Sequence, residues 1–216
     1  MEWSITMIVE YIQRTLLIAP PVLLALTVHE FSHAFIADKM GDPTARMLGR
    51  VTLNPLKHLD PLGTIALFAS GMFGWAKPVP INPRNFRDIS KGLLWVALAG
   101  PLSNILLAIL FAALFRLADA YGSTLALSAP NVFRPIFIMM EASIVINISL
   151  AVFNLIPVPP LDGSKVLSSL LPADKAFQFS RIEPYGFMIL FLLILTGVIN
   201  WFVSPVVYLA AGLLVG

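Results

Sequence analysis

The stretch "HEFSH", residues 29–33, brings together residue types that hold a metal ion and handle protons. On a helix, His29 and His33 lie one turn apart on the same face, so their imidazoles can bind one ion. Glu30 lies beside them, where it can take a proton from a metal-bound water, whose pKa zinc lowers to about 7. The alternative is a polar helix face with two hydrogen-bonded histidines. Ionisable groups are costly in a membrane segment, which favours the metal site.

A third ligand must come from elsewhere in the chain, because zinc hydrolases use three protein ligands and leave one position open. The candidates are His58, Asp60, Glu141 and Asp162. Glu141 is expected near the membrane face opposite the histidine pair, and His58 and Asp60 lie in a predicted turn. Asp162 follows a Pro-broken helix end, "FNLIPVPPLDGSKVL", at the depth of the pair, and is favoured as the ligand. A helix N-cap is its alternative role.

The composition indicates a membrane protein. Of 216 residues, 58% are apolar and 12% charged, whereas a soluble domain carries about 25% charged residues. A net charge of +2 without a long basic run argues against nucleic acid as a partner. The chain has no cysteine, which excludes disulfides, thiolate catalysis and cysteine-ligated zinc. Its N-terminus lacks the basic region of a cleaved signal peptide.

Apolar segments predict the path through a bilayer, since crossing about 30 Å of hydrocarbon takes roughly 20 residues. Long segments lie near 15–36, 93–115, 135–156 and 185–203. The shorter, Gly-broken stretch 62–76 is expected to be partial or re-entrant. Residues 3–14 suit an interfacial helix, and the path of 204–216 stays open. We expect one multi-pass, mainly α-helical membrane domain over 1–216.

The distribution of basic residues predicts the orientation. Eight of the 14 Lys and Arg residues fall between the first two long segments: Lys39, Arg46, Arg50, Lys57, Lys77, Arg84, Arg87 and Lys91. The connection 116–134 has two, and 157–184 has three. The positive-inside rule then makes 39–91 and 157–184 cytoplasmic. The histidine pair is therefore expected towards the cytoplasmic side of the cell membrane.

Two short extended segments are predicted in the first loop, within 46–55 and 76–82. They contain "RVTLNP" and "KPVPINP". Pro78 and Pro80 would confine the second to a sheet edge. We expect a small membrane-associated β-sheet or re-entrant insertion after the "HEFSH" helix.

Three motifs together resemble the site-2 protease family of intramembrane zinc metalloproteases. They are the His-Glu-x-x-His pattern, Gly-Pro-x-x-Asn (Gly100, Pro101, Asn104) and Asn-x-x-Pro-x-Pro-x-x-Asp-Gly (Asn154, Pro157, Pro159, Asp162, Gly163). The likeness runs from about residue 20 to residue 200. "GWAKPVPINPRNF", 74–86, is similar to small prokaryotic members without PDZ-like or nucleotide-sensing domains.

The resemblance implies roles for individual residues. His29, His33 and Asp162 would bind one zinc ion per chain, and Glu30 would be the general base. Asn154 would lie beside the site and assist the substrate carbonyl or the transition-state oxyanion. An interhelical hydrogen bond is the alternative for Asn154.

The resemblance also implies a zinc endopeptidase whose substrate is a locally unwound transmembrane segment of another protein. The edges of 46–55 and 76–82 would pair with the unwound strand. Gly100 and Asn104 would permit close helix approach, and Asn147 is assigned to packing. A metal transporter or metal-sensing membrane protein with the same ligands is the alternative function. It would need further ligands towards the outer face, where only Glu141 is present.

Overall fold

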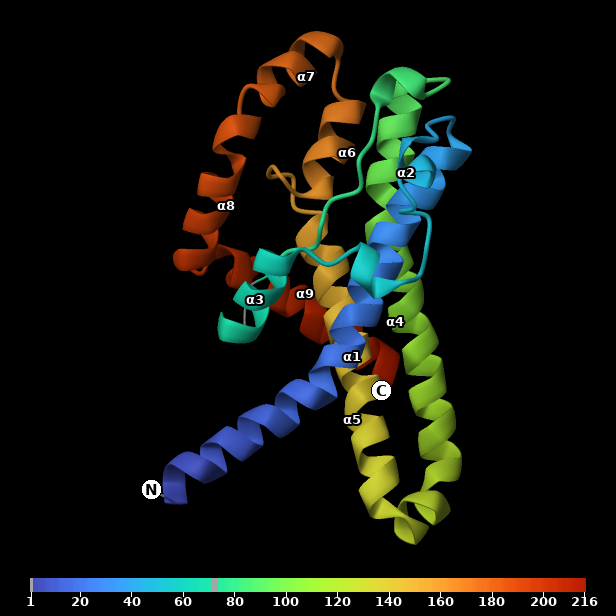
Figure 1. Ribbon diagram of the computed structural model, residues 1–216, viewed down its shortest axis with the longest axis vertical. Helices are drawn as coiled ribbons and strands as arrows, with labels where there is room; N and C mark the ends of the chain where they lie inside the picture. The colour runs from blue at the N-terminus through green and yellow to red at the C-terminus, as the bar shows by residue number, and fades with distance from the viewer. Residues whose placement is uncertain (1, 71–73) are drawn as a thin grey trace.

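Long helices that run along one axis dominate the structure, a computed structural model that describes residues 2–70 and 74–216 (Figure 1). The helices of these residues are α1 (Glu2–Lys39), α2 (Thr44–Met47), α3 (Pro61–Ser70), α4 (Ile89–Ser128), α5 (Pro130–Asn154), α6 (Asp162–Leu170), α7 (Ala173–Ser180), α8 (Gly186–Leu195) and α9 (Val198–Val215). Short 3-10 helices cover Pro55–Lys57, Pro83–Asn85 and Glu183–Tyr185. The centre of the bundle is α4, which packs against α1, α5 and α6.

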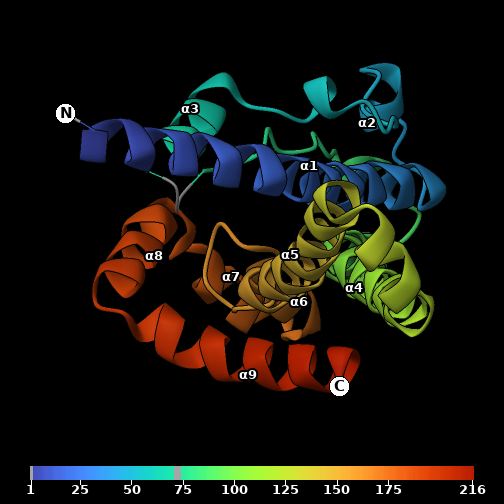
Figure 2. The same ribbon diagram turned by 90° about the horizontal axis from the view of Figure 1, so that it is seen from below.

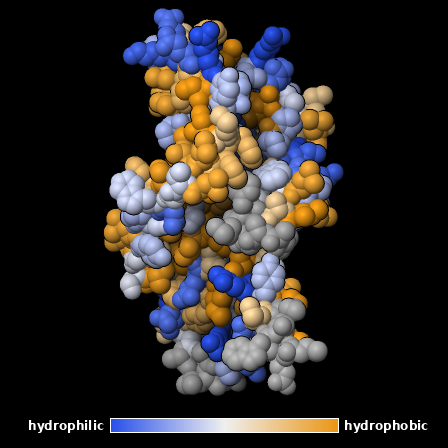
Figure 3. Space-filling model, turned by 90° about the vertical axis from the view of Figure 1, so that its left-hand side faces the viewer, coloured by the Kyte–Doolittle hydropathy of each residue, from blue (hydrophilic) through white to orange (hydrophobic). Residues whose placement is uncertain are grey.

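Five helical stretches of the described residues are long and apolar enough to cross a membrane. They are Ile5–Lys39, Ile89–Gly122, Pro130–Asn154, Ala173–Leu195 and Val198–Val215. Large apolar side chains such as Leu106, Trp201 and Leu213 stay exposed on the outer faces of these helices. Figure 3 shows broad hydrophobic surface below a hydrophilic end. Exposed apolar surface of this extent suits contact with lipid, so the prediction of a mainly helical, multi-pass membrane protein is confirmed.

Two predicted segments take a different form. Residues 3–14, expected as a separate interfacial helix, are continuous with α1, which contains Pro20 and Pro21 and bends along its length (Figure 1). The expected segment 185–203 is divided between α8 and α9 at Gly197, whose φ of 75° ends the first helix. The tail left open by the sequence belongs to α9, which runs across α4 and α5 rather than along them (Figures 1 and 2).

The two ends of the bundle carry different connections. Figure 1 shows α2, α6 and α7 at one end and the short α4–α5 connection at the other. The loops 39–91 and 157–184, which charge counting assigns to one membrane face, thus both reach the same end. Between the two ends of the bundle, side chains of α4, α5 and α9 pack into a core of Ala108, Ala112, Ile144, Ile148 and Val207.

The predicted β-sheet over 46–55 and 76–82 does not form in residues 2–70 and 74–216. Part of the first segment is helical in α2, and the one β contact among those residues is an isolated bridge between Leu59 and Ala76. The predicted re-entrant segment 62–76 is represented by α3, whose 10 residues are too few to cross a bilayer. Residues 71–73 of that segment lie outside the described part.

A buried arginine explains why the second segment stays extended without joining a sheet. The guanidinium of Arg50 donates hydrogen bonds to the carbonyl oxygens of Lys77, at 2.6 Å, and Pro78, at 3.1 Å. The Lys77 N–H donates to the His58 carbonyl at 2.8 Å, but Pro78 and Pro80 have no N–H to continue a ladder. A side chain has therefore taken the place of a neighbouring strand.

Candidate metal centre

Three side chains with metal-binding atoms meet inside the bundle: His29 and His33 from α1, and Asp162 from the start of α6. The Nε2 atoms of the two histidines lie 3.0 Å apart. Oδ2 of Asp162 lies 3.2 Å from Nε2 of His29 and 3.1 Å from Nε2 of His33. All three side chains are buried. The structure thus brings together the ligands proposed from the sequence, although Asp162 lies 129 positions after His33 (162 − 33).

The turn between α5 and α6 delivers Asp162 to this point. The N-cap of α6 is Leu161, which makes no side-chain cap, and Asp162 is the first helical residue with its carboxylate towards the histidines. The alternative role of Asp162 as the N-cap is therefore wrong. Gly163 makes the approach possible, because a Cβ there would lie 2.2 Å from the carbonyl oxygen of Leu155 at the end of α5.

The other ring nitrogen of each histidine has a fixed partner. Nδ1–H of His33 donates to the backbone carbonyl of Val96 at 2.7 Å. Nδ1 of His29 lies 2.6 Å from Oδ1 of Asn104. With both protons on Nδ1, the neutral rings present their Nε2 lone pairs to the Asp162 carboxylate.

This donor set fits zinc. Two lone pairs and a carboxylate oxygen that converge without a shared proton repel one another unless a cation lies between them. Tetrahedral zinc with bonds of about 2.0–2.1 Å places its ligands about 3.3 Å apart, close to the separations of 3.0–3.2 Å found here. Imidazole and carboxylate are ordinary zinc ligands, and three of them leave the fourth position for water or substrate.

The other sequence candidates have structural roles. Nε2 of His58 donates to the Thr52 carbonyl at 2.8 Å, and its ring is buried. Oδ1 of Asp60 accepts the Gly63 N–H at the start of α3. Glu141 is exposed on α5. The metal-binding group found among the described residues contains none of these three.

Gly100 lies directly against the histidine pair. A Cβ on this residue would lie 2.5 Å from Nε2 of His33 and 2.6 Å from Nε2 of His29. The expectation that Gly100 permits close helix approach is confirmed. Asn104, expected to act in the same way, instead forms a hydrogen bond to His29. The sequence carried a signal for this contact, since an amide in an apolar segment needs a polar partner.

Glu30 and Asn154 lie near the ligands in the chain, but within the described residues neither forms a hydrogen bond or an ion pair with them. Glu30 is half-buried on α1 beside His29. Burial lowers the pKa of the Arg50 guanidinium, and the Glu30 carboxylate opposes that shift, which places the two charges near each other. Asn154 is half-buried at the end of α5, where its Nδ2 donates to the Leu150 carbonyl at 3.0 Å. That bond lies within one helix and is not the interhelical bond considered from the sequence.

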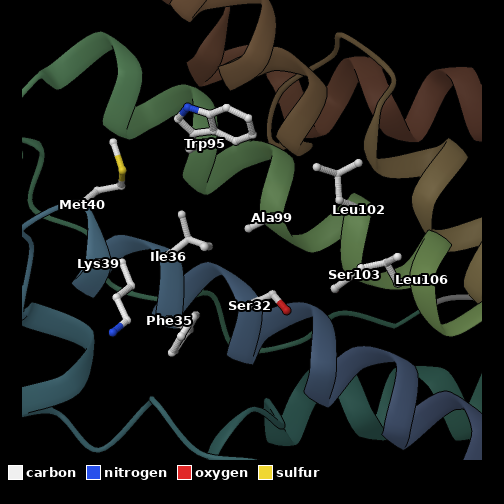
Figure 4. A pocket seen from close by; sticks show the side chains of 10 residues that line it. All are labelled: Ser32, Phe35, Ile36, Lys39, Met40, Trp95, Ala99, Leu102, Ser103 and Leu106. Atoms are coloured by element: carbon white, nitrogen blue, oxygen red, sulfur yellow. The ribbon is translucent and has the colours of Figure 1, made fainter.

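A groove of about 420 Å³ on the described part of the chain is separate from the metal-binding group. Figure 4 shows it between α1 and α4, with Trp95 and Lys39 towards one end and Leu106 towards the other. Ser32 and Ser103 are its neutral polar side chains, and it contains none of the three proposed ligands. Glu30 is not part of its lining either, so this groove is distinct from the candidate site.

Comparisons with known proteins agree with this chemistry. Residues 18–197 match the sequence model of peptidase family M50. A Bacillus subtilis (strain 168) protein named "Putative zinc metalloprotease YwhC" is 38% identical over 184 residues, which are 85% of this chain and 82% of that protein. A Mycolicibacterium smegmatis protein named "Putative zinc metalloprotease Rip2" is 29% identical over 197 residues, which are 89% of this chain and 72% of that protein. No solved structure matches the chain.

Proposed function

The chain belongs to peptidase family M50 and is a membrane zinc metalloprotease, and we propose that His29, His33 and Asp162 bind its zinc ion while Glu30 is its general base. The convergence of the two Nε2 atoms and the Asp162 carboxylate within 3.2 Å carries this proposal. Residues 1–216 would form one such domain.

Zinc held by these ligands would polarise a peptide carbonyl and ease the deprotonation of water. Glu30 then accepts a proton from the attacking water and returns it to the leaving amine nitrogen as the C–N bond breaks. Asn154 holds the substrate carbonyl or the developing oxyanion with its side-chain N–H. For this, its amide must exchange the Leu150 carbonyl for the substrate.

The substrate we propose is a locally unwound transmembrane segment of another membrane protein. The extended residues 77–82 support this, since Arg50 links them to the neighbourhood of Glu30. Within the described residues, the N–H groups of Val79 and Ile81 make no hydrogen bond. An unwound substrate strand can accept from them, and so keep its own backbone paired in a water-poor place.

We place the site towards the cytoplasmic side of the cell membrane. The support is the basic character of 39–91 and 157–184, which the positive-inside rule assigns to the cytoplasm. The alternative of a metal transporter or sensor is not favoured, because the family is one of peptidases and Glu141 stands exposed, apart from the metal-binding group.

The test replaces Glu30 with Gln, which keeps the shape of the side chain but cannot accept the proton. In liposomes with a model transmembrane substrate, Glu30→Gln should retain zinc and lose about a hundredfold or more in cleavage rate. Glu183→Gln, an exposed carboxylate before α8, is the matched control and should cleave normally. Normal cleavage by Glu30→Gln would overturn the base assignment, and lost zinc would make Glu30 a ligand.

A further inference from the structure

A chain of buried amides connects His29 to α5. Asn104 on α4 and Asn147 on α5 are both 0% exposed. Oδ1 of Asn104 lies 2.6 Å from Nδ1 of His29, and Nδ2 of Asn104 donates to Oδ1 of Asn147 at 2.7 Å. Nδ2 of Asn147 donates to the Ser143 carbonyl at 2.8 Å. Three helices are therefore joined by hydrogen bonds that end on a proposed zinc ligand.

Each partner in this chain fixes the direction of the next. The Ser143 carbonyl can only accept, so Asn147 must turn its NH₂ towards it and its oxygen towards Asn104. Asn104 must then turn its NH₂ to that oxygen and to the Ala25 carbonyl, at 3.2 Å. Its remaining oxygen faces His29 and accepts a proton from Nδ1. The lone pair of His29 is thereby left on Nε2, towards Asp162.

We propose that Asn104 and Asn147 are positioning residues that keep His29 in its zinc-binding tautomer and slow the release of the metal. The proposal rests on the zinc site proposed above. Outer hydrogen-bond partners of metal-binding histidines typically change metal affinity about 10–100-fold when they are removed. An amide suits this role inside a membrane, since it orients the ring without adding a buried charge.

The two histidines differ in how their orientation is maintained. His33 donates to a backbone carbonyl, that of Val96, which no side-chain substitution removes. His29 depends on the side chain of Asn104, whose own direction depends on Asn147. The orientation of His29 is thus the part of the site that substitutions on α4 and α5 control.

The test measures how fast zinc leaves the folded protein. Zinc-loaded wild type, Asn104→Leu, Asn147→Leu and the double variant are mixed in detergent with excess chelator, and release is followed over time. Asn104→Leu should release zinc about 10–100-fold faster. Asn147→Leu should give a smaller increase, because Asn104 keeps its oxygen but can rotate. The double variant should match Asn104→Leu, because Asn147 acts through Asn104.

Asn200→Leu is the matched control, since Asn200 is exposed on α9 and accepts a hydrogen bond from Ser204. It should release zinc at the wild-type rate. Unchanged release in Asn104→Leu, or multiplying effects in the double variant, would overturn the proposal, and Asn147→Leu alone still tests it if Asn104→Leu does not fold. A wild type that binds no zinc would instead refute the zinc site itself.

Discussion

Gly100 and His33 are in contact where α4 packs against α1, so that a Cβ on residue 100 would lie 2.5 Å from Nε2 of His33. The three nearest atoms to that Cβ belong to His33 and His29, and two of them are the proposed zinc-binding nitrogens. A side chain at residue 100 would therefore occupy the space in which the ligands converge. The lack of one is a requirement of the site and not only of helix packing.

Gly100→Ala should abolish zinc binding, because the methyl group forces the imidazoles away from Asp162. We expect the zinc content after dialysis to fall at least about tenfold, with a matching loss of cleavage. Gly212→Ala on α9 is the control, since a Cβ there meets no atom within 4 Å. Full zinc content in Gly100→Ala would show that α4 can move away at little cost.

Asp162→Ala should also lower the zinc content, but by removing a ligand and not by crowding. Two histidines alone should not retain zinc through dialysis, since structural and catalytic sites use at least three protein ligands. His58→Ala is the informative comparison, because His58 is the remaining histidine of the chain. Its buried ring donates a hydrogen bond to the Thr52 carbonyl in its own loop. Metal analysis of the two variants decides whether Asp162 or His58 is the third ligand. Full zinc content in Asp162→Ala would show that the third ligand is a residue other than Asp162.

The convergence of His29, His33 and Asp162, our proposed ligands, could be predicted from the sequence because it depends on local helix geometry and on depth in the membrane. The spacing of His29 and His33 fixes their common face on any helix, and Asp162 was assigned from the level at which its segment ends. The tautomer of His29 was not predictable from the sequence. It depends on whether Asn104 turns its amide oxygen or its NH₂ group towards His29, and the direction of Asn104 in turn depends on Asn147. That choice exists only after three helices have packed.

The failed sheet prediction has the same physical origin. Residues 76–82 are extended, as their prolines indicate, but an extended segment does not determine what pairs with it. The carbonyls of Lys77 and Pro78 accept from Arg50, which a count of hydrophobic and polar residues cannot reveal. Arg50 is a charged loop residue that is only 5% exposed, and its burial against these carbonyls is what the sequence did not reveal.

Arg50→Met should therefore impair cleavage while leaving zinc in place. Without the guanidinium, two carbonyls lose their donors and residues 77–82 lose their attachment near Glu30. We expect kcat/KM to fall about tenfold or more and residues 77–82 to become sensitive to added protease. Arg50→Lys should recover little, since an ammonium cannot reproduce the fork that reaches both carbonyls.

Arg84→Met is the control for that experiment, because Arg84 is an exposed arginine of the same loop. An exposed charge contributes little, so the cleavage rate of this variant should stay close to wild type. Equal losses in the two variants would mean that loop charge in general, and not the hydrogen bonds of Arg50, supports cleavage.

Asp42 should make the stability of the loop after α1 depend on pH. Burial raises the pKa of Asp42, but hydrogen bonds from Thr44, Asn85 and Asn82 outweigh it and hold the pKa below its ordinary value of 3.8. Its Oδ2 accepts the Asn82 N–H at 2.7 Å and its Oδ1 accepts Nδ2 of Asn85 at 2.8 Å, so the carboxylate ties α1 to the segment before α4.

Because the folded pKa is the lower one, this stabilisation is complete above about pH 4 and is lost as the pH falls through the folded value. Asp42→Asn should lower the free energy of unfolding by about 1–3 kcal/mol at pH 7, since the amide turns a donor towards the loop's N–H groups. Thermal unfolding in detergent from pH 7 to pH 3 measures both effects. The gap between wild type and Asp42→Asn should narrow as the pH falls below 4, and a gap that stays constant would show that these hydrogen bonds do not depend on the charge of Asp42.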